Sequence, residues 1–569
     1  HTLLARVESA HRDDADAALQ RLKAFEDADA RAALSEALRA EVALWLGWAH
    51  ARRNAEADEE ARALRLLDEA EQRFAALHAP HGRCWAHIGR AQAYFALDEY
   101  HLMRRTLDEA ADLHARTQDV QADAWIHDLQ VPALRFRGRY DAAQSHIDAL
   151  RKRGQSANDR RLRGRAAAHQ AALDYDRGRP PAHVIDVSQT AETLLRALDG
   201  RPGYPLLAAY HARIGALLRQ GAWDQAEAQI DDAESVMRPY RLGQAHLDTL
   251  RARLAYRRGQ CEKAGALLEA LFEHAHRLPH GLHRSHVALL RGELLSHWNE
   301  YDDAGTWIER SVQNARETGH RGDQLRSLLT LASVAQDHGD WATAADAIAR
   351  ADAYGDYRSV LPYVVLRFRV LGVQAQHDGR LDDARGAFTQ ATSAASLIGD
   401  VYETARLQMA RATLGPVDAA RARPLLEAAS TTFDRLGATR DAARAHALLA
   451  DLADGPPPFD AAGTQEPTPG WTPSPIGDAL GGHLARASFS VDLVAEAWLQ
   501  SVERLLPGHW MGVYRRTPEG TWTRVHAHGT PPPVVANATD PLPTLPDADA
   551  LRWMALRGDT ADTADAFRM

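Results

Sequence analysis

The chain has 569 residues, 45% of them hydrophobic and 25% charged, so it holds enough apolar material for a large buried core. Its net charge of −10 argues against a protein that holds nucleic acid through bulk positive charge, and we expect no direct nucleic-acid contact. Only three of the 67 basic residues are lysines, and none of Lys23, Lys152 and Lys263 follows a glycine, which excludes a Walker A phosphate-binding loop.

The cysteines and the hydropathy bear on the cellular compartment. Cys84 and Cys261 lie 177 positions apart, which suggests neither a disulfide framework nor a thiol-only zinc site. There is no run of 18 apolar residues and no signal peptide, so we expect no membrane span and no export. A cytoplasmic location follows. Because the chain opens at His1 without a methionine, we expect it to be a fragment with functional parts beyond it.

A short phrase recurs along most of the chain. It consists of Gly, Asn or Asp, then one residue, a bulky residue, two further residues and a small residue. Six of the bulky residues fit a spacing of about 40 positions. Weaker copies fall at Gly178-Arg-Pro180, Ala63 to Ala70 and Gly415 to Ala420. The bulky residues of the clear copies are Tyr100, Tyr140, Trp223, Cys261, Tyr301, Trp341 and Leu381.

Each position of the phrase has a physical role. Gly, Asn and Asp tolerate the left-handed backbone that ends a helix and starts a tight turn. The small residue lets two helices approach closely, and apolar or small residues follow four and seven positions later on the same face. The phrase therefore predicts a series of antiparallel helical hairpins.

This pattern resembles the tetratricopeptide repeat, in its longer form of about 40 residues found in bacterial regulators similar to the maltose-regulon transcription activator. Junctions such as Glu317 to Asp323 and Leu436 to Asp441 have the form typical of that variant. The resemblance implies an all-α fold over residues 1–453, a right-handed α-solenoid of about ten hairpins that stack on their neighbours. An irregular α-helical protein is the alternative.

The pattern stops at Asp454, and residues 454–475 form a Pro/Gly-rich linker. In the remaining segment, 476–569, Ser490 is placed to cap a helix over 491–506, and 510–516 with 521–528 predict a β-hairpin. A helix followed by such a hairpin resembles the opening of a GAF-type sensory domain. No later strands are visible, so we expect an incomplete, truncated α/β piece, onto which the family's ligand residues cannot be transferred.

The sequence offers little for catalysis or metal binding. It lacks the G-x-S-x-G, H-E-x-x-H and paired C-x-x-C motifs, and acidic pairs such as Asp302-Asp303 and Asp382-Asp383 fit helix starts better than a carboxylate site. Two histidine clusters could supply zinc ligands, but their spacing matches no established site and solvated loops explain them better. We therefore expect no enzyme, no cofactor and no metal. The clusters are His274, His276, His280, His283 and His286, and His78, His81, Cys84 and His87.

In this repeat family the first helix of each hairpin lines the concave wall of the superhelix. Applied to this chain, that rule gives a wall that is aromatic early and rich in arginine and histidine later, which suits carboxylates, peptides and flat ligands. The alternative is that some of these residues belong to the core. The predicted site residues are Trp48, Arg52, Trp85, Phe95, Trp125, Arg135, Tyr175, His211, Arg219, His246, Arg253, Tyr256, Arg257, His286, Glu293, His297, Arg326, Arg369 and His377.

The functional hypothesis is a non-enzymatic sensory or protein-interaction region of a bacterial signalling or transcription regulator. It would bind a protein, an acidic peptide or a small-molecule effector in the concave groove and control an output domain beyond the chain. Two alternatives stay open: a passive scaffold for protein complexes, and the sensory region of a cyclic-dinucleotide enzyme or kinase. No membrane contact is expected, and a homodimer is compatible with the sequence.

Overall fold

The computed structural model describes residues 15–53, 59–196, 203–237, 241–275, 281–354, 360–414, 419–454, 510–516, 522–528 and 552–556. The chain divides into two compact units, His1–Pro456 and Pro457–Met569. The predicted domain boundaries at 453 and 475 stay predictions. Most of the predicted linker and the whole of the predicted helix 491–506 lie outside the described residues.

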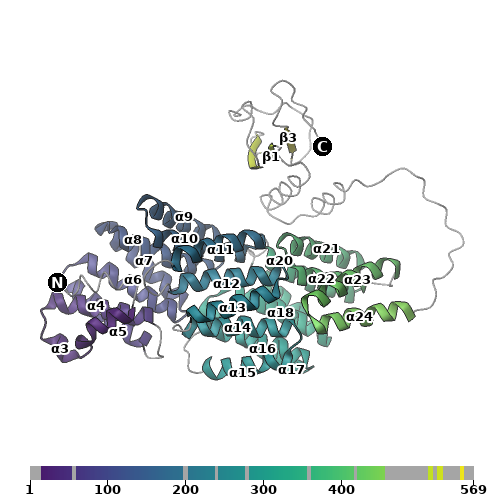
Figure 1. Cartoon of the computed structure of the whole chain (residues 1–569), viewed down its shortest axis with the longest axis horizontal. Coiled ribbons are helices and arrows are strands. Elements are labelled where there is room, and N and C mark those ends of the chain that lie inside the picture. Colours follow the sequence, from purple (N-terminus) through teal and green to yellow (C-terminus); the bar gives the residue numbers. More distant parts are fainter. Residues whose placement is uncertain are drawn as a thin grey trace. The chain divides into compact units, whose positions relative to one another are not determined.

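In its described residues the first unit contains ten consecutive helical hairpins (Figure 1). Helices α2 (Ala15–Leu22) and α3 (Ala28–Ala32) precede them, and α24 (Thr439–Asp454) follows. We call the first helix of each hairpin helix A and the second helix B. The pairs are α4 (Glu36–Arg53) and α5 (Glu59–Ala76), α6 (Pro80–Ala96) and α7 (Tyr100–Thr117), α8 (Val120–Arg135) and α9 (Tyr140–Ser156), α10 (Arg160–Arg177) and α11 (Pro181–Arg196), α12 (Gly203–Arg219) and α13 (Trp223–Met237), α14 (Arg241–Arg257) and α15 (Cys261–Ala275), α16 (Gly281–His297) and α17 (Tyr301–Thr318), α18 (Arg321–His338) and α19 (Trp341–Asp352), α20 (Leu361–His377) and α21 (Leu381–Leu397), and α22 (Val401–Ala412) and α23 (Ala419–Leu436).

The turns inside the hairpins confirm the predicted phrase. In all seven clear copies the bulky residue is the first residue of helix B. Two positions earlier, the backbone adopts the left-handed conformation that glycine, asparagine and aspartate tolerate best. The φ angles at these seven turns are 58° at Asp98, 72° at Gly138, 79° at Gly221, 76° at Gly259, 63° at Asn299, 83° at Gly339 and 74° at Gly379, and the weaker copy at Gly178 has 77°.

The small residue of the phrase is the close contact between the helices. Ala143, Ala226, Ala304 and Ala384 are all fully buried, as is Met103, which holds this position in the copy at Tyr100. The apolar residues four positions later are buried too, so one seam of packed side chains runs through successive hairpins. These observations confirm an all-α solenoid and rule out the irregular alternative for this unit. Among the described helices, none is long and apolar enough to cross a membrane.

The solenoid coils tightly enough for one superhelical turn to pack on the next. The backbone N–H of Arg321 donates to the carbonyl of Phe136 at 2.9 Å, and the Thr439 hydroxyl donates to the carbonyl of Arg258 at 3.0 Å across 181 positions. The rings of Trp223 and Tyr402 lie 5.6 Å apart at a third such contact. In each case a turn inside one hairpin meets a junction between hairpins about four and a half repeats later.

This inter-turn packing changes the predicted concave groove. A superhelix of about four and a half repeats per turn has little space along its axis, and the next turn covers the open side. Inner-wall side chains therefore face other inner-wall side chains across a narrow interior. The middle of the expected open groove is instead a narrow, partly open chamber.

In the described residues of the second unit, three strands form one antiparallel sheet. β1 (Trp510–Arg516) pairs with β2 (Trp522–His528), which confirms the predicted strand pair. β3 (Arg552–Leu556) pairs with the other edge of β1, giving the order β2-β1-β3. The expectation that no strand follows the hairpin was therefore wrong. A strand of five residues is too short for its alternation of polar and apolar residues to be recognised in the sequence. β3 forms because the open edge of β1 offers it a hydrogen-bonding partner.

Two glycine substitutions test the packing between turns. Gly221 and Gly339 have nearly the same φ, so alanine at either position should cost about 1–2 kcal/mol of left-handed strain. A Cβ at Gly221 would also lie 2.8 Å from Cδ2 of the buried Leu436 in the next turn, whereas one at Gly339 would meet nothing within 4 Å. We expect Gly221→Ala to lower the urea midpoint, followed by circular dichroism, clearly more than Gly339→Ala does. Equal losses would contradict the inter-turn contact.

Candidate functional site

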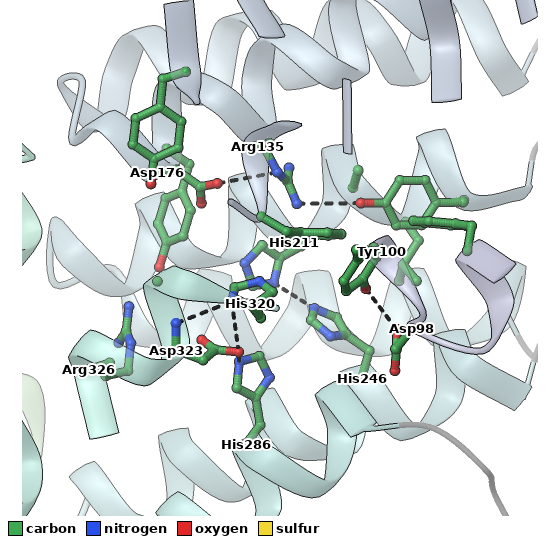
Figure 2. A pocket seen from close by; sticks show the side chains of 18 of the residues that line it. Asp98, Tyr100, Arg135, Asp176, His211, His246, His286, His320, Asp323 and Arg326 are labelled. Atoms are coloured by element: carbon green, nitrogen blue, oxygen red, sulfur yellow. Dashed lines mark hydrogen bonds and ion pairs between the residues drawn. The ribbon is translucent and has the colours of Figure 1, made fainter. Parts of the chain in front are cut away.

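The inner helices of the two superhelical turns enclose a polar cavity, which we call the chamber (Figure 2). Helix A of eight successive hairpins, α6 to α20, contributes to its wall. Its free volume is about 130 Å³, enough for several water molecules or one small polar ligand, and it opens to solvent at its mouth. The wall consists of His211, His246, His286, His320, Arg135, Arg253, Arg326, Asp98, Asp176, Asp323, Tyr100, Tyr140, Tyr175, Tyr204, Tyr363, Phe95, Phe136, Leu207, Ala208 and Gly322.

Arg135, the last residue of α8, is fixed within the wall of the chamber. Its side chain is only 8% exposed, and its Nε lies 3.3 Å from a carboxylate oxygen of Asp176. Its second amino group donates to the Tyr204 hydroxyl at 3.4 Å, and its guanidinium lies over the Phe136 ring. Burial raises the pKa of Asp176, although the Arg135 charge opposes that shift. This guanidinium therefore already has a protein carboxylate as its partner.

Four histidines form two pairs inside the chamber, as Figure 2 shows. Nε2 of His246 lies 2.5 Å from Nδ1 of His211, and burial lowers the pKa of His211 well below its usual value. His286 and His320 face one carboxylate instead, at 2.9 and 3.3 Å from Oδ2 of Asp323. Burial opposes ionisation of Asp323, but the two imidazoles outweigh it and hold the pKa of this carboxyl below its usual range.

The remaining wall is mainly aromatic. Burial raises the pKa of Tyr100, Tyr140, Tyr204 and Tyr363, so these phenols stay neutral and can donate hydrogen bonds. The Tyr100 hydroxyl donates to Asp98 at 2.7 Å. The chamber thus combines neutral donors, flat rings and fixed charges. That combination suits binding and orientation of a polar ligand.

Eight of the predicted site residues lie together around the chamber. They come from hairpins spread over more than 200 positions of sequence, and the coiling of the solenoid brings them to one cavity. They are Phe95, Arg135, Tyr175, His211, His246, Arg253, His286 and Arg326.

The predicted tryptophans lie apart from the chamber, at a second pocket in the first hairpins. Trp48, Trp85 and Trp125 line this pocket together, with the Trp48 ring edge-on to both others at 5.5 and 5.2 Å. Arg52 and Arg165 both lie over the Trp125 ring, at 5.5 and 4.4 Å. Trp48 is only 1% exposed, so it belongs to the core as well as to the pocket wall.

Beneath the tryptophans lies a buried ionic cluster. Arg165 donates to both carboxylate oxygens of Asp128, at 2.9 and 2.5 Å, and His169 lies 2.9 Å from the same carboxylate. These partners hold the pKa of Asp128 below its usual range against the effect of burial. Every charge of the cluster is satisfied within it, which favours a structural role.

The other predicted site residues do not line either pocket, and most are paired within the wall. Arg219 lies over the Tyr175 ring at 3.9 Å and donates to the Tyr175 carbonyl. The Tyr256 hydroxyl donates to the Glu293 carbonyl at 3.2 Å. The remainder make separate contacts: Arg257 over the ring of Tyr402, Arg369 with Ser333 and Glu403, His377 stacked on Trp341, and His297, whose pKa is lowered by burial.

Sequence reasoning missed several chamber residues, and for identifiable reasons. Asp98, Tyr100 and Tyr140 were assigned to the hairpin turns, where they do serve, and their reach into the chamber carries no sequence signal. His320 caps α18 and Asp323 lies in its first turn, whereas the sequence pattern placed both in the junction from Glu317 to Asp323. Tyr204, Leu207 and Tyr363 lie on helix A, but outside the positions that the family rule selects, whereas Ala208 lies at such a position and carries no recognition group of its own. Phe136 directly follows a helix A, and Gly322 lies in the first turn of α18 beside Asp323.

The histidine clusters considered for metal binding do not form a ligand set in the part of the chain that the structure describes. No group of three or more His, Cys, Asp or Glu side chains there is arranged to hold a metal ion. His81 contacts Asp119, the Cys84 thiol donates to the Ala110 carbonyl, and His87 faces Glu109. Of the cluster from His274 to His286, only the His286 side chain lies within the described residues.

Comparisons with known proteins give structural matches only. No protein-family model and no curated protein sequence matches the chain. Among solved structures, a Rap protein complexed with competence and sporulation factor matches 73% of this chain and 98% of its own, at 13% identity and a TM-score of 0.34. The APC/C hetero-tetramer Cut9-Hcn1 matches 73% and 90%, at 12% identity and a TM-score of 0.40. Yeast Tom70 matches 73% and 93%, at 11% identity and a TM-score of 0.29.

The buried histidine at the start of α18 predicts a dependence of stability on pH. Burial lowers the pKa of His320 from 6.5 to about 4, so the unfolded chain binds this proton more readily than the folded chain does. Stability from neutral His320 is therefore complete above about pH 6.5 and is lost as pH falls towards 4, by on the order of 3 kcal/mol. The His320 side chain caps α18 by accepting a hydrogen bond from the backbone N–H of Asp323. An asparagine side chain can accept the same hydrogen bond but has no proton to gain in this pH range.

We expect His320→Asn to flatten the dependence of the urea midpoint on pH between 6.5 and 4. His101→Asn, at an exposed position, is the matched control and should leave the wild-type slope unchanged. An identical slope in wild type and in His320→Asn would show that His320 does not titrate in this range.

Proposed function

We propose that the first unit is a non-enzymatic regulatory region that binds an effector in the chamber. The effector is a small molecule, or the end of a peptide or protein partner, and its binding controls an output domain beyond this chain. The observation that carries the proposal is the chamber itself, a partly open cavity lined by charged, histidine and aromatic side chains, whose wall comes from both superhelical turns. A passive scaffold has no need of such a cavity.

The composition of the wall supports binding rather than catalysis. Among the described residues that line the chamber there is no serine, threonine, cysteine or lysine to act as a nucleophile. The carboxylates that could accept a proton are engaged, Asp323 by two imidazoles and Asp176 by Arg135. Donors, rings and fixed charges remain available for recognition.

The position of the chamber supports a regulatory role. Phe136 and His320 both line it, and the hydrogen bond from Arg321 to the Phe136 carbonyl joins the two turns beside it. A ligand that contacts both turns binds the closed arrangement better than an open one and so shifts the population towards closure. When the two superhelical turns pack more closely, the relative position of the hairpins in them changes. An attached output domain would respond to this change.

The proposed setting is a cytoplasmic bacterial transcription regulator, with the second unit as the start of a GAF-like sensory domain. The antiparallel order β2-β1-β3 is compatible with such a domain. A sensory region of a cyclic-dinucleotide enzyme or kinase remains the alternative for the output. A scaffold would show the same radius of gyration in small-angle scattering with and without its partner.

A variant that fills the chamber tests the proposal. Ala208 is 4% exposed and lines the chamber, whereas Ala142 is exposed on α9. The wild-type chain is screened by thermal unfolding against a panel of amino acids, dipeptides, sugars and nucleotides. At 100 times its Kd, a true effector adds about 2.7 kcal/mol of stability. We expect this stabilisation to survive in Ala142→Phe and to be lost in Ala208→Phe. The proposal would be overturned if every compound of the panel stabilised Ala208→Phe as much as it stabilises wild type and Ala142→Phe.

A further inference from the structure

Two arginines of the chamber differ from the others on the inner wall. Arg253 of α14 and Arg326 of α18 line the cavity, yet no hydrogen bond, ion pair or ring contact reaches either guanidinium from the described residues. Arg135 is held by Asp176, Arg219 by the Tyr175 carbonyl and Arg369 by Glu403. In Figure 2, Arg326 projects from the helix that also carries Asp323, and no dashed line meets it.

The two unpaired guanidiniums also repel one another. Burial lowers the pKa of Arg253 to about 10, and the next largest cause is the positive charge of Arg326. The Glu293 charge acts favourably on both, but no ion pair links it to either. Holding two like charges together at a buried site costs stability unless a counter-charge is present.

Nearby carboxylates act on the two guanidiniums only at a distance: the Asp323 charge helps to raise the pKa of Arg326, but no ion pair joins a described carboxylate to either arginine. Asp323 lies between His286 and His320, at 2.9 and 3.3 Å, and Asp176 is engaged by Arg135. Asp98 accepts a hydrogen bond from Tyr100. Both guanidiniums therefore keep hydrogen-bond donors that an incoming anion can pair with.

We propose that Arg253 and Arg326 form an anion-binding site, and that the effector carries a carboxylate or phosphate group that sits between them. The guanidinium group suits this task because its planar set of donors matches the oxygens of carboxylate and phosphate in pairs. The aromatic rings of Tyr175, Tyr204 and Phe95 in the same wall offer flat surfaces for the body of the ligand. This inference rests on the proposed function and adds the chemical class of the ligand.

The experiment uses the full chain and four probes at constant ionic strength: succinate, its neutral analogue succinamide, inorganic phosphate and triglycine. Thermal unfolding and calorimetric titration measure binding. We expect saturable stabilisation by at least one anionic probe and none by succinamide. Arg253→Gln and Arg326→Gln should each weaken that binding about tenfold or more. Arg385→Gln removes an exposed arginine that pairs with Asp382, and it should bind as wild type does. Triglycinamide, which lacks the C-terminal carboxylate, serves as the control for triglycine. Binding of triglycine but not of triglycinamide would show that the site accepts the carboxylate of a peptide.

The unliganded variants give a second readout. If Arg253 and Arg326 serve to bind an anion, replacing one of them in the unliganded protein removes the repulsion between the two charges. The melting temperature of each variant should then equal or exceed that of wild type. A fall of several degrees in both variants would mean that these arginines are structural, and would overturn the proposal.

The outcomes separate this inference from the proposed function. Neutral members of the effector panel that stabilise wild type and both glutamine variants alike would overturn the anion site and leave the chamber as a binding site. Anionic probes that stabilise wild type no more than the double variant Arg253→Gln/Arg326→Gln would overturn the anion site as well. Failure of the proposed function is read separately, from equal behaviour of wild type and Ala208→Phe.

Discussion

The packing of one superhelical turn on the next decides the environment of the inner wall. Turns inside hairpins, such as Gly259, meet junctions about four and a half repeats later, such as that at Thr439. This contact encloses the axis, removes water from charged side chains and forces them to find partners across the interior. The buried pair of Arg135 and Asp176 and the imidazoles around Asp323 are consequences of it. In an open superhelix the same residues would be solvated and ordinary.

The hairpins could be predicted from the sequence because their causes are local. A left-handed residue at position 138 or 379, a bulky residue two positions later and a small residue three further on specify one hairpin without reference to the rest of the chain. The closure of the superhelix could not be predicted in this way. It depends on small rotations between neighbouring hairpins that accumulate over about 180 residues, and no single residue encodes them.

The same division holds for the candidate site. Arg253, His286 and Arg326 were identified because a position rule places them on the inner face of helix A, and the enclosed chamber then brings them together. Tyr100 escaped notice because its role in the turn explained it fully, and Tyr363 because it lies outside the positions of the rule. The tryptophans Trp48, Trp85 and Trp125 satisfied the rule but gather at a separate pocket. The position rule identifies residues on the inner face of helix A. Which residues that face contacts depends on the path of the superhelix.

The contacts between turns also bear on how the chain unfolds. A linear array of repeats, in which each contacts only its neighbours, can fray from either end and lose its parts one by one. Here the hydrogen bond between Thr439 and Arg258 ties α24, near the end of the array, to its middle. Loss of one repeat therefore removes support from a distant one, and the array gains cooperativity and a higher contact order than its local hairpins alone would give. The price is slower folding, because the turns cannot meet until most of the hairpins between them have formed.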